Sequence, residues 1–308
     1  MSASGGTKAI VAALTANLGI AVTKLAAFLL SGSPSMLAES IHSVADAASQ
    51  GLLLVGGRRA HRDATPTHPF GYGRERYIYA FIVAVVLFSV GGLFALYKGW
   101  AKVQEPHPIE EWRWLPVVVL LVAIALETYS FRTAFVESNR HRNGRSWVQF
   151  VRSAKAPELP VVLLEDLGAL VGLILALAGV GLTLLTGDGL YDALATMAIG
   201  ALLVSIAGIL AVESKSLLLG ESATAADVAM IETALSAVPA ISRIIHMKTL
   251  YVGPDEILVA AKIAIRHDAT AAELAATIEA AEAGIRHAVP AARMIYLEPD
   301  LDRGWAVS

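Results

Sequence analysis

The first two thirds of the chain alternate between long apolar runs and short polar connections. Each run is about 20 residues long, the length at which an α-helix crosses the hydrocarbon core of a bilayer. The runs cover roughly residues 9–30, 35–57, 78–100, 114–136, 159–185 and 188–212. This pattern predicts a membrane all-α domain, a bundle of six transmembrane helices.

From about Thr224 the pattern becomes that of a soluble domain. Val228, Ile231, Leu235 and Val238 recur at helical spacing, which predicts an amphipathic helix. Alternating runs of the kind found in strands follow, with a turn and a further helix among them. These are SRIIHMKTLYV, the turn Gly253-Pro254, EILVAAKIAI, a helix over roughly 270–288, and ARMIYLEP. We therefore expect a transmembrane domain over 1–215 and a small α+β domain, of order αββαβ, over 216–308.

Composition supports a membrane protein and excludes several classes of function. The chain is 56% hydrophobic and 17% charged, with a mean hydropathy of +0.60, which is too apolar for an ordinary soluble domain. A net charge of −3 without a basic block gives no reason to expect nucleic acid as a partner. Because there is no cysteine, disulfides, thiolate zinc sites and cysteine catalysis are excluded. The N-terminus lacks a signal-peptide pattern, so we expect the first span to be retained.

The connections between spans predict the orientation in the bilayer. Basic residues gather after the second span and after the fourth. They are Arg58, Arg59, Arg62, Arg74 and Arg76, and then Arg140, Arg142, Arg145, Arg152 and Lys155. By the positive-inside rule both loops are cytoplasmic. We therefore expect cytoplasmic termini, a cytoplasmic soluble domain and a location in a bacterial inner membrane.

The second span contains a polar stripe in the stretch LAESIHSVAD (37–46). Glu39, His42 and Asp46 follow one another at three- and four-residue spacing, which places them on one helical face. An imidazole and a carboxylate one turn apart form half of a tetrahedral site for zinc or a similar divalent metal. The alternative is a buried hydrogen bond that joins helices. Ionisable residues inside a membrane mark ion or proton pathways, so the stripe favours an ion site.

The fifth span contains a second acidic pair, in VVLLEDLGALVG. Asp166 lies about nine residues from the predicted cytoplasmic end of its span, and Asp46 about a dozen from that of its own. The two carboxylates are therefore expected at similar depth. Glu165 points about 100° away from Asp166 on the helix. It is either a metal ligand or a polar contact with another span, for which Lys24 and Glu127 are the candidates.

With LAESIHSVAD and the loop HPFGYGRERY (68–77), the chain resembles the cation diffusion facilitator family over essentially its whole length. The loop is similar to that of the mitochondrial-type zinc transporter branch. The resemblance implies a homodimeric efflux protein, not an enzyme, that exchanges cytoplasmic divalent metal for protons without a prosthetic group. It also implies that His42, Asp46 and Asp166 form the transport site.

The chain departs from the family pattern at one position of that site. Val162 stands where the family has histidine, four residues before Asp166. The missing ligand is expected to be Glu165, Glu39 or water, or else the preferred ion differs from zinc. Without that imidazole the site has a harder set of ligand atoms. Mn²⁺, Fe²⁺ and Co²⁺ therefore become stronger candidates for the transported ion relative to Zn²⁺.

Two further metal sites of the family are incomplete in this sequence. In the loop, His68 is present but Tyr72 stands in place of a second histidine. In the soluble domain His246 resembles a family ligand, whereas Lys262, Tyr296 and Glu298 do not match the expected ligands. We therefore expect the soluble domain to dimerise rather than to hold a metal cluster.

The sequence predicts a secondary transporter in which protons and metal compete for the same groups, because binding needs neutral histidine and ionised carboxylate. Rocking of helices around a midplane site would give alternating access, and Gly168, Gly172, Gly179 and Gly181 would permit close packing. The alternative is a non-transporting metal sensor or scaffold that dimerises through its soluble domain. A membrane metal hydrolase is disfavoured because no H-E-x-x-H motif occurs.

Overall fold

The chain forms two compact units in the computed structural model. The described residues are 3–31, 34–105, 114–142, 144–266 and 268–301, with the side chains of 3–6, 27–28, 30–31 and 34–42 outside the description. One unit comprises Met1–Arg59 and Glu75–Lys215, and the other comprises Ala60–Arg74 and Ser216–Ser308. The connection between the second and third spans therefore belongs to the same unit as the C-terminal residues.

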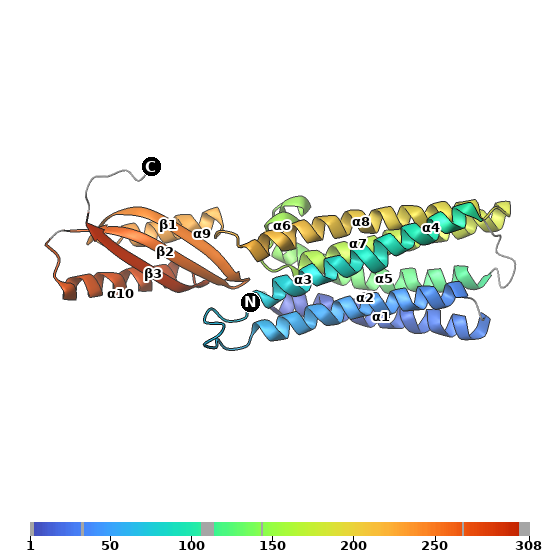
Figure 1. Ribbon diagram of the computed structural model, residues 1–308, viewed down its shortest axis with the longest axis horizontal. Helices are drawn as coiled ribbons and strands as arrows, with labels where there is room; N and C mark the ends of the chain where they lie inside the picture. Colours follow the sequence, from blue (N-terminus) through green and yellow to red (C-terminus); the bar gives the residue numbers. More distant parts are fainter. Residues whose placement is uncertain (1–2, 32–33, 106–113, 143, 267, 302–308) are drawn as a thin grey trace. The chain divides into compact units, whose positions relative to one another are not determined.

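The first unit is a bundle of long helices that run side by side (Figure 1). Its elements are α1 (Ala3–Ser31), α2 (Pro34–Ala60), α3 (Glu75–Val86), the π-helical segment η1 (Leu87–Leu93), α4 (Phe94–Gln104), α5 (Trp114–His141), α6 (Trp147–Ser153), α7 (Glu158–Thr186) and α8 (Leu190–Leu219). The segments α3, η1 and α4 follow one another without a break and form one span. The predicted transmembrane bundle is confirmed, with helix ends that extend beyond the apolar runs.

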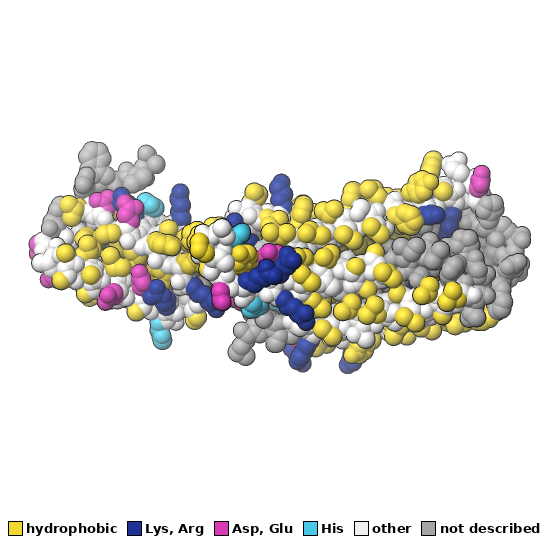
Figure 2. All heavy atoms as spheres, turned by 60° about the horizontal axis from the view of Figure 1, so that its bottom comes forward, with side chains coloured by type: hydrophobic (Ala, Val, Ile, Leu, Met, Phe, Trp, Pro, Cys, Tyr) yellow, Lys and Arg dark blue, Asp and Glu magenta, His cyan; other side chains and the backbone are white. Residues whose placement is uncertain are grey.

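Within the described residues, five helices are long and apolar enough to cross a membrane. These helices expose large hydrophobic side chains such as Leu121 and Ile174, and hydrophobic side chains cover much of the helical face that Figure 2 shows. Helix α2 is not among the five, since its described part carries Asp46, Arg58 and Arg59. It nevertheless has 27 residues, or about 40 Å at 1.5 Å per residue, which exceeds the hydrocarbon thickness of about 30 Å.

Glycines bring several helices into close contact. Gly168 of α7 lies against Ile206 of α8, and Gly179 lies against Ala195. A Cβ added at Gly92, in η1, would come within 2.6 Å of the Val204 side chain. These positions exclude larger side chains for steric reasons. Gly181 has open space around it, so the prediction that it serves close packing was wrong.

Replacing Gly200 by alanine is expected to destabilise the bundle by about 1–3 kcal/mol, the usual range for overpacking. The new Cβ would lie 2.7 Å from the backbone nitrogen of Leu96, and backbone cannot move aside as a side chain can. Thermal unfolding in detergent measures the effect. Gly208→Ala is the matched control, because a Cβ at Gly208 meets nothing within 4 Å. Equal melting temperatures for the two variants would contradict the prediction.

Two local features of the first unit were not predicted from the hydrophobic pattern. The segment η1 is π-helical, and such bulges inside α-helices are rare. The short helix α6 begins with a capping box, in which Ser146 and Gln149 satisfy each other's backbone N–H groups. Both depend on local backbone geometry, to which a 20-residue hydropathy window is insensitive.

The second unit contains a two-layer α+β domain. Its elements are α9 (Ala225–Ser236), β1 (Ile241–Gly253), β2 (Glu256–Ile265), α10 (Ala271–Ala288) and β3 (Ala292–Leu301). The sheet order is β1-β2-β3, with β1 and β2 antiparallel and β2 and β3 parallel. Ile231 and Leu235 of α9 and Ile285 of α10 are fully buried in one core with Ile257 and Ile263 of β2. The predicted order αββαβ is confirmed.

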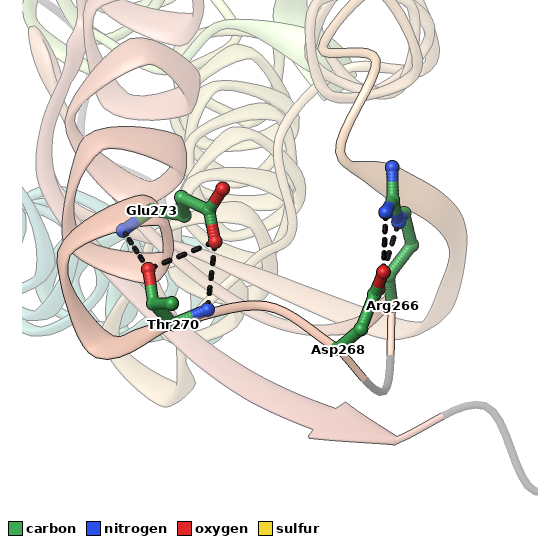
Figure 3. Close-up of polar contacts among 4 residues, drawn as sticks. All are labelled: Arg266, Asp268, Thr270 and Glu273. Atoms are coloured by element: carbon green, nitrogen blue, oxygen red, sulfur yellow. Dashed lines mark hydrogen bonds and ion pairs between the residues drawn. The ribbon is translucent and has the colours of Figure 1, made fainter.

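Helix α10 begins at a capping box that Figure 3 shows. The Thr270 hydroxyl accepts from the Glu273 backbone N–H at 3.3 Å, and Glu273 Oε2 accepts from the Thr270 backbone N–H at 2.8 Å. The Glu273 carboxylate accepts from the Thr270 backbone N–H and also from the Thr270 hydroxyl, and these two bonds lower its pKa. Arg266 and Asp268 form a separate ion pair at 2.6 Å beside this turn. The polar groups at this end of the domain therefore satisfy one another.

Candidate ion site inside the helix bundle

Among the described residues of the helical unit, four carboxylates interact with one another inside the bundle. Asp46 on α2 is partly buried, and the other three are almost completely buried. These are Glu127 on α5, at 1% exposed, and Glu165 and Asp166 on α7, at 5% and 1%. The carboxylates interact electrostatically with one another, and Lys24 on α1, itself buried, interacts with Glu127. Such a concentration of like charge in an apolar interior requires a compensating cation or bound protons.

Two hydrogen bonds fix the acidic pair of α7. The Ser130 hydroxyl, on α5, donates to Asp166 Oδ2 at 2.5 Å. The Gln50 amide, on α2, donates to Glu165 Oε2 at 2.6 Å. Of the two polar contacts expected for Glu165, Glu127 interacts with it electrostatically, while the hydrogen bond from Gln50 was not predicted. A glutamine amide reaches Glu165 because α2 lies beside α7, which the sequence of either helix does not reveal.

Gln50 and Ser130 were missed by the motif analysis, although a signal exists for both. Gln50 lies four residues after Asp46 and so continues the stripe of α2 by one turn. Ser130 lies three residues after Glu127, on the corresponding face of α5. Extending the search for polar residues one turn beyond each ionisable group would have identified both.

Two oxygen atoms of this cluster, Gln50 Oε1 and Glu165 Oε1, have no hydrogen-bond partner among the described side chains. Gln50 is 0% exposed, so bulk water does not solvate its amide. A buried acceptor without a donor costs about 1–3 kcal/mol. Unsatisfied acceptors beside several carboxylates fit a place for a cation, which accepts oxygen ligands.

The positions predicted for the metal ligands are not all described. Asp46, Glu165 and Asp166 are brought together with Glu127, whereas the side chains of Glu39 and His42 lie outside the described residues. Among the described side chains, no three histidine, aspartate or glutamate groups converge closely enough to hold a metal ion. Like charges keep apart unless a cation draws them together, so convergence is expected to accompany binding.

Val162, where the resemblance implied histidine, is fully buried in the apolar core of the bundle. The same cluster contains Leu159, Val161 and Ile206. An aliphatic side chain packs there without a polar atom to satisfy. The residue at this position therefore contributes packing and no ligand.

An ion pair joins two helices at the ends that begin the third and fifth spans. Arg76 of α3 donates from Nε to Glu158 Oε1, and from Nη2 to Glu158 Oε2 at 2.9 Å. The side chains are only 8% and 5% exposed. The bidentate geometry satisfies both carboxylate oxygens of Glu158. The burial of this carboxylate is therefore explained by its arginine partner, whereas the burial of the acidic cluster is not explained in this way.

In the connection between the second and third spans, His68 is held by its neighbours. Its ring stacks on Tyr72, with centroids 4.6 Å apart, and its Nδ1 lies 3.1 Å from the Tyr72 hydroxyl. Its backbone N–H donates to the Thr65 hydroxyl at 3.2 Å. These contacts fit a histidine that packs within the loop.

In the soluble domain, a lysine lies where a metal site would need ligands. His246, Lys262 and Glu298 are neighbours across the three strands. Lys262 Nζ lies 3.0 Å from carboxylate oxygens of both Glu298 and Asp300. These hydrogen bonds raise the pKa of Lys262, so the ammonium remains charged near neutrality. Its charge already compensates the two acids and opposes a metal ion at this position.

Membrane-crossing helices around buried carboxylates define the class as a multi-pass membrane protein that handles cations. A family model confirms the class, since the cation efflux transmembrane domain matches residues 10–219. The chain belongs to the cation efflux, or cation diffusion facilitator, family and to its mitochondrial-type branch. The family is one of cation transporters and not of enzymes.

The relatives are named as metal transporters and metal tolerance proteins. The mitochondrial proton-coupled zinc antiporter SLC30A9 of Xenopus laevis is 31% identical over 265 residues, which cover 85% of this chain and 47% of the relative. The human SLC30A9 is 32% identical over 232 residues, covering 75% and 41%. Metal tolerance protein C4 of Arabidopsis thaliana is 27% identical over 251 residues, covering 80% and 54%. The chain thus spans about half the length of these relatives.

Proposed function

We propose that the chain is a secondary transporter that exports a divalent transition metal from the cytoplasm in exchange for protons. The observation that carries the proposal is the group of interacting carboxylates inside membrane-crossing helices, with two acceptor oxygens left unsatisfied. The names of the SLC30A9 relatives, which specify proton-coupled zinc antiport, support the same activity. Zn²⁺ is the first candidate as cargo, followed by Mn²⁺, Fe²⁺ and Co²⁺.

Within this proposal His42, Asp46 and Asp166 bind the ion, and Glu165 or Glu39 supplies a further oxygen. Ligation requires neutral imidazole and ionised carboxylates, so bound protons and bound metal exclude one another. Metal entering from the cytoplasm displaces protons from these groups. On the other side, protons return to the same groups and the metal leaves. This competition couples the two fluxes without a prosthetic group.

The proposal includes an arrangement in the membrane. Arginine-rich connections after α2 and after α5 favour cytoplasmic termini and a cytoplasmic α+β domain. Homodimerisation through that domain and a bacterial inner-membrane location are parts of the proposal. Access is expected to alternate as helices move around the carboxylates, while glycine contacts such as Gly168 with Ile206 keep neighbouring helices close.

Metal-driven proton movement tests the function. In proteoliposomes that contain a pH-sensitive dye, we expect Zn²⁺, Mn²⁺, Fe²⁺ or Co²⁺ added on the cytoplasmic face to drive protons to that face. The rate should saturate with metal concentration, since a binding site limits it. Liposomes without protein control for leakage. Tight metal binding without proton movement would support the sensor or scaffold alternative, and no flux with any of the four ions would contradict transport.

A further inference from the structure

Gln50 is placed to do more than join two helices. It is 0% exposed and lies one helical turn from Asp46 on α2. Its Nε2 donates to Glu165 Oε2 at 2.6 Å, which fixes the plane of the amide, while its Oε1 accepts from no donor in the part of the chain that the structure describes. A leucine or methionine would fill similar space without the cost of burying an unsatisfied carbonyl. The cost of burying this carbonyl oxygen without a donor indicates that it binds a partner.

The second oxygen without a partner belongs to the same hydrogen-bonded pair. Glu165 Oε1 is buried and unsatisfied, so the pair presents one amide oxygen and one carboxylate oxygen that both lack a donor. Asp46 and Asp166 interact electrostatically with Glu165, and Glu127 adds a further negative charge. A cation satisfies both oxygens and the surrounding charge together, whereas a neutral donor would satisfy only the oxygens.

We propose, as an extension of the transport function proposed above, that Gln50 is an oxygen ligand of the transported ion. Gln50 and Glu165 supply oxygen ligands alongside Asp46 and Asp166, in place of the imidazole that Val162 does not provide. The ligand set then contains one nitrogen, from His42, and otherwise oxygen. Oxygen ligands favour harder ions, so Gln50 shifts the preference of the site toward Mn²⁺ relative to Zn²⁺.

A purely structural role for Gln50 makes a different prediction. If the side chain served only to hold α2 against α7, its replacement would change stability and leave the relative affinity for two metals unaltered. If its oxygen binds the ion, the donor atom at this position sets the relative affinity. The ratio of the dissociation constants for Zn²⁺ and Mn²⁺ therefore separates the two roles.

The test uses the full chain in detergent, with bound Mn²⁺ measured by electron paramagnetic resonance and displaced by Zn²⁺. Gln50→His exchanges the oxygen for an imidazole nitrogen, and we expect the preference for Zn²⁺ over Mn²⁺ to rise roughly tenfold or more. Gln50→Asn keeps the amide but withdraws its oxygen by one methylene, and Mn²⁺ affinity should fall about tenfold. Gln104→His, at an exposed position on α4, is the matched control and should leave the ratio unchanged.

An unchanged ratio in Gln50→His, together with unchanged Mn²⁺ affinity in Gln50→Asn, would overturn the assignment. Size-exclusion profiles and melting temperatures identify a variant that fails to fold, in which case the other variant decides. Proton flux in vesicles of the wild-type protein is measured in parallel. A wild-type protein that transports, with an unaltered ratio in the variants, would refute the role of Gln50 alone. A wild-type protein without flux would refute the transport function. The ratio of the dissociation constants for Zn²⁺ and Mn²⁺ would still show whether Gln50 binds the metal.

Discussion

Asp166→Asn is expected to abolish metal-driven proton flux, with a loss of more than about 100-fold. Changes in groups that only support metal ligands already cost about 10–100-fold, and this substitution removes a charged group of the proposed site itself. The amide has nearly the same shape as the carboxylate and can still accept from the Ser130 hydroxyl, which donates at 2.5 Å in the wild type. The helix contact is therefore retained while the charge is lost. Flux in proteoliposomes measures the effect, and Asp46→Asn should behave in the same way.

Glu137→Gln is the matched control for this experiment. Glu137 is also a largely buried carboxylate on α5, but it pairs with Arg140 at 2.9 Å on the same helix. Removing its charge should leave flux within about twofold of the wild type, because Glu137 pairs within its own helix, where such pairs contribute little, and is not part of the proposed ion site. Wild-type transport by both Asp46→Asn and Asp166→Asn would show that the ion site lies elsewhere, even if the protein is a transporter.

The second large effect is expected at the ion pair between α3 and α7. Arg76→Met should destabilise the helical unit by about 3–5 kcal/mol, because Glu158 would remain as a buried charge without its partner. Both side chains are almost completely buried, at 8% and 5% exposed, so water cannot replace the guanidinium. Unfolding by sodium dodecyl sulfate, followed by circular dichroism, gives the change in free energy.

The double substitution Arg76→Met with Glu158→Leu separates the two contributions to that loss. Replacing both partners of a buried pair by apolar groups is often neutral or stabilising, so stability should return to within about 1 kcal/mol of the wild type. Arg266→Met is the control, because Arg266 and its partner Asp268 are 70% and 68% exposed, so water replaces the guanidinium and stability should stay close to that of the wild type. A double variant as unstable as Arg76→Met would show that the arginine acts through other contacts.

The elements that the sequence predicted well are those with a strong periodic signal. The apolar runs marked the membrane helices because each helix buries its own backbone hydrogen bonds in lipid and so must be apolar over a full span. The soluble domain followed from alternation in runs such as EILVAAKIAI and from the turn at Gly253-Pro254. The π-helical segment η1 and the short helix α6 depend on only a few residues each, and the hydrophobic pattern did not predict them.

The charged residues of the candidate site were predicted from the sequence, whereas the uncharged residues that hydrogen-bond to them were not. Asp46, Glu165 and Asp166 are conspicuous because a carboxylate in an apolar run is costly. Gln50 and Ser130 are uncharged, and the one signal for them in the sequence is their position one turn beyond Asp46 and Glu127. Their contribution depends on which atom each faces, and that is set by the packing of α2 and α5 against α7.

The sequence by itself determined which segments are helices in a membrane, which form the αββαβ domain, and that carboxylates lie within the apolar spans. These are local properties, since hydropathy and periodicity depend only on neighbouring residues. The tertiary structure alone decided that the Glu165 carboxylate accepts from the Gln50 amide, and that a lysine compensates the acids of β3. Such pairings join residues far apart in the chain, as Gln50 and Glu165 are. They are fixed by the packing of whole helices and strands, which no single segment encodes.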